Sequence, residues 1–219
     1  ALVNAAGANF VLLGPGQTML KASKPVIAIT AVRTGSGKSP TTRKVSRVLK
    51  KEGIRPVVVR HPMPYGNLEE QVCQRFQRHE DLERHHCTIE EREEYEPLIE
   101  EGVTLFAGVD YQKILRQAER EADLILWDGG NNDFPFYQPD LYITLVDPHR
   151  PGHEVSYYPG EVNLRLAHVV IINKVSTAQK SAVRQVERNI QGCNPQATVI
   201  RADLEVTIDC PECVKNKRV

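Results

Sequence analysis

The chain lacks an excess of charge of either sign, because 28 lysines and arginines balance 28 aspartates and glutamates among its 219 residues. This balance argues against the basic surface that binds nucleic acid and against the high net charge of a disordered chain. The sequence has no apolar run long enough to span a bilayer, so we expect no membrane partner. The apolar residues 1–16 have no basic leader and do not resemble a secretory signal.

Cysteine is scarce, and its distribution argues against a disulfide framework. The five cysteines are scattered and odd in number: Cys73, Cys87, Cys193, Cys210 and Cys213. This usage favours reduced thiols and a cytoplasmic location. The last two form a single C-x-x-C pair, which without a second pair is too weak a signal for a zinc or redox site.

Residues 25–52 form the segment around which the rest of the chain is organised. A short run rich in β-branched residues leads through a glycine-containing turn to a Lys-Ser pair, and a helical pattern follows. A strand, a glycine loop, Lys-Ser and a helix in this order are typical of a phosphate-binding P-loop. The predicted nucleotide-contacting residues of this loop are Thr34, Gly35, Ser36, Gly37, Lys38 and Ser39.

Each part of this pattern has a chemical role. Glycines let backbone N–H groups converge on phosphate oxygens, and the helix N-terminus adds partial positive charge. Lys38 would reach the β- and γ-phosphates of ATP or GTP, and the Ser39 hydroxyl would bind Mg²⁺. The full pattern has a glycine where this chain has Val32, so a chance Gly-Lys-Ser after an ordinary strand is the alternative. The flanking strand and helix favour the P-loop.

Apolar runs alternate with helical patterns along the rest of the chain. The alternation predicts an α/β fold, a P-loop NTPase with a mostly parallel sheet and helices on both faces. Strands are expected at residues 9–13, 26–32, 54–59, 124–127, 141–146, 169–172 and 197–200, with a short strand or buried turn at 103–107. Helices are expected at 111–122 and 177–190; residues 67–101 have mostly helical propensity, and their acidic run at 90–94 predicts a solvated helix face.

The same pattern suggests three regions. We assign residues 1–24 to the tail of a preceding domain or an edge strand, 25–203 to a P-loop NTPase domain, and 204–219 to the start of a truncated C-terminal region. Polar residues follow several predicted strands of the middle region. Ligands of open α/β sheets bind at the carboxyl ends of the strands, so we expect these residues to share one crevice.

Asp128 follows the apolar strand at residues 124–127. An aspartate in this place in P-loop proteins holds Mg²⁺ directly or through water, so Ser39 and Asp128 are the predicted metal ligands. The alternative is an aspartate that caps a turn. The polar loop that follows ends in Asp133, which we interpret as a second metal contact or a base. Lys38, Asp128 and Asp133 are the predicted catalytic residues.

Asn173 and Lys174 follow the strand at residues 169–172. In GTP-binding proteins this pattern continues with an aspartate that accepts two hydrogen bonds from guanine, but this chain has Ser176 there. A neutral hydroxyl does not reproduce an acceptor with two charged oxygens. We predict that Asn173 and Lys174 pack against the base, and that adenine suits the site at least as well as guanine.

Two predicted loops at this edge carry more cations than a nucleotide alone needs. Arginine side chains suit phosphate oxygens, so we predict a second, anionic substrate that is itself a small phosphorylated acid. The predicted substrate-binding residues are Arg33, Arg60, His61, His149 and Arg150. For each residue alone, a surface cation is the alternative. His149 and His153 are not favoured as metal ligands, because no third histidine or cysteine lies in their segment.

Seven stretches of the chain together resemble a known family. They are KPVIAITAVRTGSGKS (24–39), RHPMPYG (60–66), CTIEEREEYEP (87–97), AGVDYQKIL (107–115), WDGGNNDFPF (127–136), VDPHRPGHE (146–154) and INKV (172–175). From about residue 9 to its end, the chain is similar to the cyclic 2,3-diphosphoglycerate synthetase family and its broadly distributed homologues, which are often labelled GTPases. The resemblance implies a P-loop core of the class that includes dethiobiotin synthetase-like enzymes and metal-chaperone GTPases.

The resemblance also implies a reaction that uses ATP and Mg²⁺. One phosphate of 2,3-diphosphoglycerate accepts the γ-phosphoryl group and is then attacked by its neighbour, which closes an intramolecular phosphoanhydride. Two features depart from the family. Relatives that continue the INKV stretch with aspartate have Ser176 here, which weakens the GTPase label, and members are longer on both sides of this core.

Three functions are open from the sequence. The first is an ATP- and Mg²⁺-dependent synthetase or kinase-like enzyme, expected as a cytoplasmic homodimer, that acts on a small phosphorylated acid. The second is a GTP-hydrolysing switch or chaperone that signals to a partner. The third is a nucleotide-binding protein without catalysis. Ser176 argues against the second, and the cationic loops favour the first.

Overall fold

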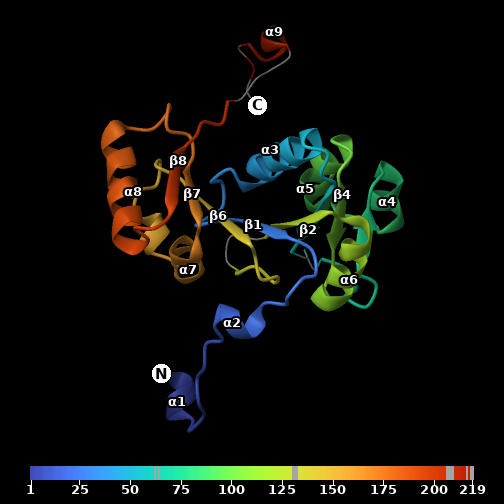
Figure 1. Cartoon of the computed structure of the whole chain (residues 1–219), viewed down its shortest axis with the longest axis horizontal. Coiled ribbons are helices and arrows are strands. Elements are labelled where there is room, and N and C mark those ends of the chain that lie inside the picture. Colours follow the sequence, from blue (N-terminus) through green and yellow to red (C-terminus); the bar gives the residue numbers. More distant parts are fainter. Residues whose placement is uncertain (62, 64, 130–132, 206–209, 216, 218–219) are drawn as a thin grey trace.

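The computed structural model describes residues 1–61, 63, 65–129, 133–205, 210–215 and 217. Its centre is an eight-stranded sheet with the strand order β3-β4-β2-β5-β1-β6-β7-β8 (Figure 1). The strands are β1 (Val26–Ala31), β2 (Pro56–Arg60), β3 (Gln74–Phe76), β4 (Thr104–Ala107), β5 (Leu124–Asp128), β6 (Leu141–Val146), β7 (Val169–Ile172) and β8 (Thr198–Arg201). All neighbouring strands run parallel except β3 and β4, so the predicted α/β class is confirmed.

The central strands are buried on both faces, which explains their composition. Every residue of β2 is buried, and in β1 only Ile27 is partly accessible. β-Branched residues are frequent in both strands because they fill a pleated surface that is covered on each side. Parallel strands end at the same edge, so the carboxyl ends of β2, β5, β1, β6 and β7 lie side by side in that order.

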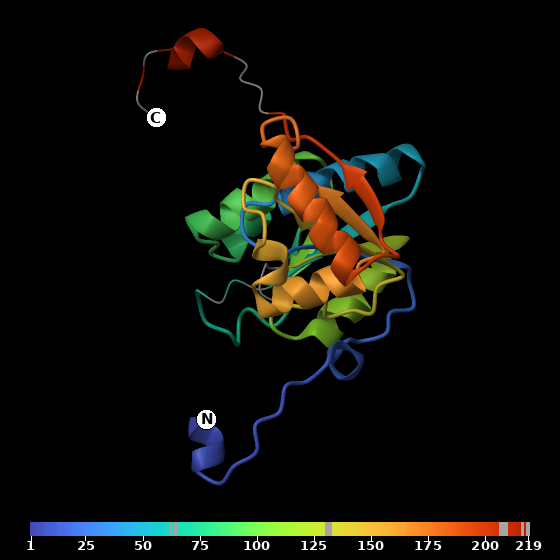
Figure 2. The ribbon, with the colours of Figure 1, turned by 90° about the vertical axis from the view of Figure 1, so that its left-hand side faces the viewer.

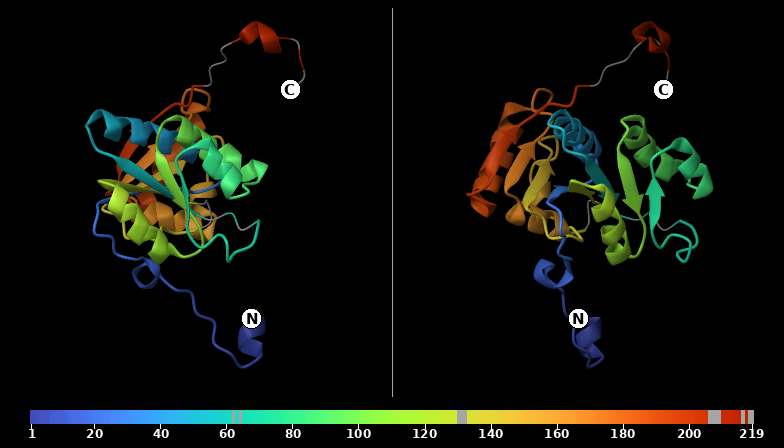
Figure 3. Two further views of the ribbon diagram at one scale, coloured as in Figure 1. Left: turned by 90° about the vertical axis from the view of Figure 1, so that its right-hand side faces the viewer. Right: turned by 45° about the vertical axis from the view of Figure 1, so that its right-hand side comes forward.

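Helices cover the two faces of the sheet in two groups (Figure 3). The main helices are α3 (Lys38–Lys51), α4 (His79–Arg84), α5 (Ile89–Glu100), α6 (Tyr111–Glu121), α7 (Tyr158–Leu166) and α8 (Lys180–Cys193). Tyr95 of α5 shares a core cluster with Leu126 of β5, whereas Ile114 of α6 shares one with Trp127 on the opposite face of that strand. None of the helices in the described residues is long and apolar enough to cross a membrane.

The N-terminal segment differs from the sequence prediction. Residues 9–13 are not a strand: Phe10, Val11, Leu12 and Leu13 are exposed, and no strand of the described chain pairs with them. The segment lies away from the sheet together with α1 (Leu2–Ala5), and α2 (Pro15–Thr18) follows it (Figure 2). A strand needs a partner edge for its N–H and C=O groups, and this apolar run has none there.

The elements that were not predicted include β3 and α7. β3 lies within the mostly helical residues 67–101 and pairs antiparallel with β4, which places Phe76 opposite Leu105. Its strand conformation therefore depends on a distant partner and not on local propensity. Helix α7 begins with Pro159 in its first turn, where the missing N–H of proline has no helical acceptor to lose.

One pair of cysteines corrects the prediction of reduced thiols. Cys210 and Cys213 form a disulfide at α9 (Pro211–Val214), where their Cα atoms lie 5.4 Å apart. This separation is in the range that a disulfide bridges, and one turn of chain is enough to produce it. Cys73, Cys87 and Cys193 are free, so none of the five cysteines cross-links the sheet.

The packing of α7 against the end of β1 leads to a first prediction. A Cβ at Gly160 would lie 2.6 Å from the Val32 carbonyl oxygen. We expect Gly160→Ala to lower the free energy of unfolding by about 1–3 kcal/mol, because the helix and the strand must separate. The matched control is Gly192→Ala in α8, where a Cβ meets nothing within 4 Å. In urea unfolding, the control should be at least as stable as the parent. Equal urea midpoints for the two variants would contradict the close packing of Gly160 against Val32.

Candidate functional site

The loop after β1 has the backbone geometry of a phosphate-binding loop. Gly35 and Gly37 have positive φ angles of 83° and 99°. A Cβ at Gly37 would also lie 2.2 Å from the Asn173 side-chain nitrogen Nδ2, so only glycine fits there. Helix α3 begins at Lys38, directly after this glycine, and its first N–H groups face the loop.

Val32 takes the place of the first glycine without distorting the loop. It is not among the described non-glycine residues with positive φ. Its N–H donates to the Leu145 carbonyl oxygen at 3.1 Å, and its buried side chain lies in the same core cluster as Leu164 of α7. The position continues β1 toward the loop and therefore does not require glycine.

Three buried charged side chains lie beneath the loop. Lys38 Nζ donates to Asp128 Oδ1 at 2.5 Å, and Arg60 donates to Asp128 Oδ2 at 2.9 Å. Arg60 and Asp128 are paired positions of β2 and β5, so the sheet register brings them together. Burial alone would raise the pKa of the Asp128 carboxyl, but the Lys38 and Arg60 charges outweigh burial and hold this pKa below its usual value.

Glu94 of α5 extends this charged group. Arg60 donates to Glu94 Oε2 at 2.7 Å, and the Ser39 hydroxyl donates to the same oxygen at 3.3 Å. Burial would lower the pKa of Arg60, but the carboxylates on both of its sides raise it. The prediction of a solvated face for the acidic run is therefore wrong for Glu91, which is buried and caps its own helix, whereas the Glu94 side chain keeps 38% of its surface accessible.

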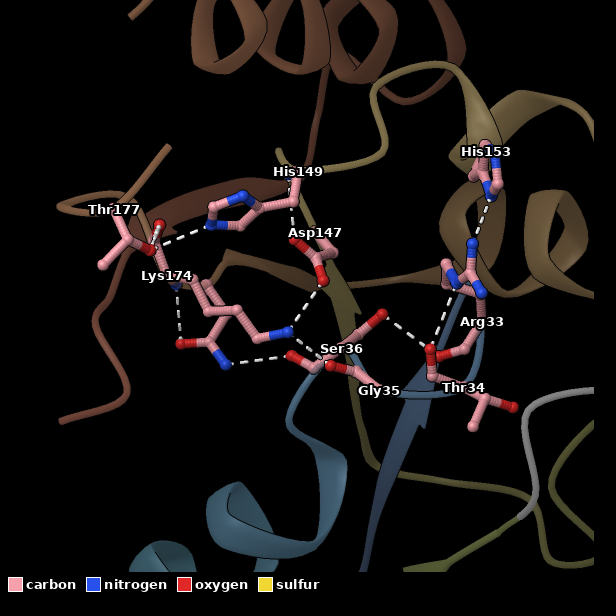
Figure 4. Close-up of polar contacts among 10 residues, drawn as sticks. Arg33, Thr34, Gly35, Ser36, Asp147, His149, His153, Lys174 and Thr177 are labelled. Carbon is pink, nitrogen blue, oxygen red and sulfur yellow. Dashed lines mark hydrogen bonds and ion pairs between the residues drawn. The ribbon is translucent and has the colours of Figure 1, made fainter. Parts of the chain in front are cut away.

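Asn173 and Lys174 bind two carbonyl oxygens of the loop, and Figure 4 shows Lys174 beside Gly35 and Asp147. Asn173 Nδ2 donates to the Ser36 oxygen at 2.9 Å. Lys174 Nζ donates to the Gly35 oxygen at 2.5 Å and to the Asp147 carboxylate at 2.8 Å. The two residues predicted to contact a base thus contact the loop itself, and they tie it to the ends of β6 and β7.

The predicted acceptor-binding cations lie in different surroundings. Arg33 donates to His153 Nδ1 at 2.7 Å, and because arginine only donates, this ring nitrogen is the acceptor. His149 lies on the other side of the loop, with its Nε2 2.9 Å from the Thr177 hydroxyl (Figure 4). Arg150 is exposed. The structure therefore does not gather these cations into one cluster.

His61 and Asp133 face each other across the carboxyl ends of the strands. Nδ1 of His61 lies 3.5 Å from the Asp133 carboxylate. Both residues belong to loops that the sequence marked as functional, but residues 62, 64 and 130–132 of these loops lie outside the described residues. Asp133 stays a predicted metal contact or base.

The oxygen donors beside Lys38 fit a Mg²⁺ ion. Ser39 offers a hydroxyl, and Asp128 and Glu94 offer carboxylates. Mg²⁺ in nucleotide sites takes one or two protein carboxylates and completes its shell with phosphate oxygens and water. Within the described residues there is no group of three or more His, Cys, Asp or Glu that could hold a metal alone. Phosphate and water would therefore complete the coordination.

A cavity of about 760 Å³ opens next to the loop, between α3 and the ends of β7 and β8. Its walls include Pro40 and Thr41 of α3, Asn173, and Ala202 and Asp203 after β8. This volume is in the range of small-molecule sites, which span about 300–1,000 Å³. Neither Asp203 nor Glu94 was predicted as a site residue. Their sequence signals are weak. Asp203 follows a predicted strand, and Glu94 precedes a buried position of a helix.

The fold and the loop define a P-loop nucleotide-binding protein. The hydrogenase maturation factor HypB from Archaeoglobus fulgidus has a similar structure, with a TM-score of 0.52, 18% identity, and coverage of 82% of this chain and 81% of that chain. LpxK from Aquifex aeolicus, in complex with ATP, has a TM-score of 0.53, 12% identity, and coverage of 96% and 78%. At these identities the likeness shows the fold alone. The P-loop fold implies binding of a nucleotide and Mg²⁺ in general.

Proteins that are similar in sequence identify the family more narrowly than these structures do. Residues 102–202 match the family model described as cyclic 2,3-diphosphoglycerate synthetase, P-loop domain. The chain is 61% identical over 216 residues to arginine synthetase ArcE from Thermococcus kodakarensis, which covers 99% of this chain and 48% of that protein. It is 26% identical over 100 residues to a cyclic 2,3-diphosphoglycerate synthetase from Thermococcus sibiricus, which covers 45% and 23%.

The chain is therefore homologous to the cyclic 2,3-diphosphoglycerate synthetases and to a related synthetase, and the resemblance of its motifs is confirmed. It spans about half the length of the arginine synthetase that it matches.

The buried pair of Lys38 and Asp128 leads to a second prediction. Asp128→Asn leaves Lys38 without its charge partner and Arg60 with Glu94 alone, and we expect a loss of about 3–5 kcal/mol in the free energy of unfolding at pH 7. The folded-state pKa of Asp128 lies below its unfolded value, so the ionised form stabilises the fold above about pH 4, and this stabilisation is lost as the pH falls through the folded-state pKa.

The difference between parent and variant should therefore narrow in acid. Urea unfolding between pH 7 and pH 3 measures it. The control is Asp123→Asn, which removes an exposed pair with Arg55 and should cost about 1 kcal/mol or less. A deficit for Asp128→Asn that does not change with pH would show that the charge of this carboxyl does not stabilise the fold.

Proposed function

We propose that this chain is the nucleotide-binding part of an ATP- and Mg²⁺-dependent synthetase whose product is arginine. The observation that carries the proposal is the 61% identity over 216 residues with the arginine synthetase of Thermococcus kodakarensis. The loop supports the nucleotide part, because Gly35 and Gly37 have positive φ angles and Lys38 lies at the start of α3, beside the Asp128 carboxylate.

An enzyme that completes a guanidinium group with ATP must make an oxygen into a leaving group. The acceptor in such a reaction is a ureido acid, which is arginine with one terminal guanidinium nitrogen replaced by oxygen. This ureido oxygen is a poor leaving group. Transfer of the γ-phosphoryl group to this oxygen breaks the bond to ADP and forms a carbon–oxygen–phosphorus link. Attack by ammonia then forms the carbon–nitrogen bond, breaks the carbon–oxygen bond, and releases phosphate and a proton.

The residues beside the loop would stabilise the phosphoryl group during its transfer. With a nucleotide bound, the loop N–H groups and the Lys38 charge would hold the negative charge of the phosphates. Ser39, Asp128 and Glu94 would hold Mg²⁺, which neutralises phosphate charge when bound. Arg60 is occupied by two carboxylates, so we assign it to positioning them and not to binding the acceptor.

We place the acceptor on the side of the loop that carries Arg33. A hollow of about 170 Å³ is lined there by Val32, Arg33, Thr34 and Tyr157. An arginine at its wall suits the carboxylate of an amino acid. Roles for His61, His149 and Arg150 in acceptor binding, and the homodimer, stay predictions.

Formation of cyclic 2,3-diphosphoglycerate is the second candidate, and the family match over residues 102–202 favours it. Both reactions would share their first step, in which an acceptor oxygen takes the γ-phosphoryl group. They differ in the acceptor and in the second nucleophile, so a comparison of acceptors separates them.

The acceptor comparison measures release of ADP from ATP in the presence of Mg²⁺. The chain receives either L-citrulline, the ureido acid, with ammonium chloride, or 2,3-diphosphoglycerate. ADP release with the first pair, together with arginine detected by chromatography, is the expected result. ADP release with 2,3-diphosphoglycerate alone would establish the second candidate in its place, and release with neither acceptor would contradict both.

The role of Lys38 gives a third prediction. Lys38→Ala removes the charge that stabilises the transferring group, and we expect nucleotide turnover to fall by at least about 10²-fold while the fold is kept. The control is Lys51→Ala, which removes an exposed lysine at the end of the same helix. Turnover is measured as ADP or GDP release, and circular dichroism checks the fold. Turnover that survives in Lys38→Ala would remove the P-loop assignment.

The contact between Ser39 and Glu94 gives a fourth prediction. Glu94→Gln keeps an oxygen for Arg60 and Ser39 but removes a negative charge from the metal position. We expect the Mg²⁺ concentration for half-maximal binding of a fluorescent ATP analogue to rise by roughly tenfold. Glu93→Gln, on the exposed side of the same helix, is the control. If both variants need the same Mg²⁺ concentration, Glu94 does not contribute to the metal site.

A further inference from the structure

Asp203 lies beside the segment that follows Asn173 and Lys174. β8 pairs in parallel with β7, with Ile172 opposite Arg201, so the chain leaves both strands at the same level. The backbone pairing continues past the strands, because the Val175 N–H donates to the Ala202 oxygen at 3.2 Å. This pairing places the residue after Ala202 next to the residue after Val175, although 27 positions separate them in the sequence.

Ser176 fixes the Asp203 carboxylate. The Ser176 N–H donates to Asp203 Oδ1 at 2.7 Å, and its hydroxyl also donates to this carboxylate. These two bonds, the backbone one first, hold the pKa of the Asp203 carboxyl below its usual value, so the group is ionised at neutral pH. The residue is exposed, and its carboxylate can accept further hydrogen bonds.

The tethered carboxylate lines the cavity of about 760 Å³ next to the P-loop. The same cavity is lined by Pro40 and Thr41, which directly follow Lys38 and Ser39 in α3. A nucleotide whose phosphates lie in the loop therefore has its nucleoside beside this cavity. Asn173 and Asp203 also line this cavity, and of these two side chains the ionised Asp203 carboxylate only accepts hydrogen bonds.

We propose that Asp203 selects the base of the nucleotide, by accepting a hydrogen bond from the exocyclic amino group of a purine. The carboxylate that Ser176 lacks is thereby supplied from the end of the neighbouring strand. Adenine and guanine both carry such an amino group, whereas hypoxanthine carries none. This inference rests on the proposed function only for its nucleotide site, and it does not depend on the acceptor.

Calorimetry with ATP, GTP and ITP in the presence of Mg²⁺ tests the selection on the full chain. The parent should bind ATP at least about tenfold more tightly than ITP, because an amino group donates to a charged oxygen only in ATP. Asp203→Ala should weaken ATP binding by about the same factor and leave ITP binding unchanged, so that the preference disappears. Asp203→Asn, whose amide can donate, should favour the 6-oxo group of ITP.

The control is Glu187→Ala, which removes a carboxylate that contacts the same strand through Arg201 but lies away from the cavity. It should keep the parent preference. Thermal unfolding confirms that each variant is folded. If Asp203→Ala does not fold, Asp203→Asn replaces it in the comparison.

Four results separate this inference from the proposed function. Equal binding of ATP, GTP and ITP to the parent, or a loss of the same factor for all three in Asp203→Ala, would overturn the role of Asp203. A preference for GTP that Asp203→Ala removes would support the role and overturn the assignment of ATP. Binding of none of the three would overturn both.

Discussion

The charge on Asp128 is the constraint on which the nucleotide site depends. An ionised carboxylate that is fully buried is stable only beside positive charge and hydrogen-bond donors. Lys38 at the start of α3 and Arg60 at the end of β2 provide both. The P-loop helix and two strands must therefore meet at one point, and this requirement fixes the position of Lys38. The Asp128 carboxylate, which would destabilise the core if it were unpaired, thus organises the phosphate site.

The loop is held from two directions, and this explains how a short turn can be a rigid cradle. Beneath it, Lys38 is fixed by Asp128; on its other side, Asn173 and Lys174 bind the carbonyl oxygens of Ser36 and Gly35. The side chains that bind these carbonyl oxygens restrict the conformation of the loop backbone. Preorganised N–H donors need no rearrangement when charge develops on a phosphoryl group. The Asn-Lys pair thus has a structural role in the loop.

The sequence predicted the features that a short stretch of chain determines. The P-loop, Asp128 and the central strands follow from glycine positions, apolar runs and strand ends, each of which is local. Glu94 and Asp203 were missed because their roles depend on contacts across the fold, with Arg60 in one case and Ser176 in the other. For residues 9–13 the prediction was wrong for the opposite reason, because their hydrophobicity indicated a strand, but no sheet edge among the described residues pairs with them.

Contacts across the fold also change the interpretation of the cations that were predicted to bind the acceptor. We predicted a phosphorylated acid because the loops carry many cations. In the fold, however, carboxylates neutralise one of these cations. Arg60 is paired with two carboxylates, and Arg33 is paired with a histidine on one side of the loop, far from the contact that holds His149. A substrate with several phosphates needs several cations that converge. One arginine beside a small hollow suits a single carboxylate, which supports the amino-acid acceptor that we propose over a diphosphorylated one.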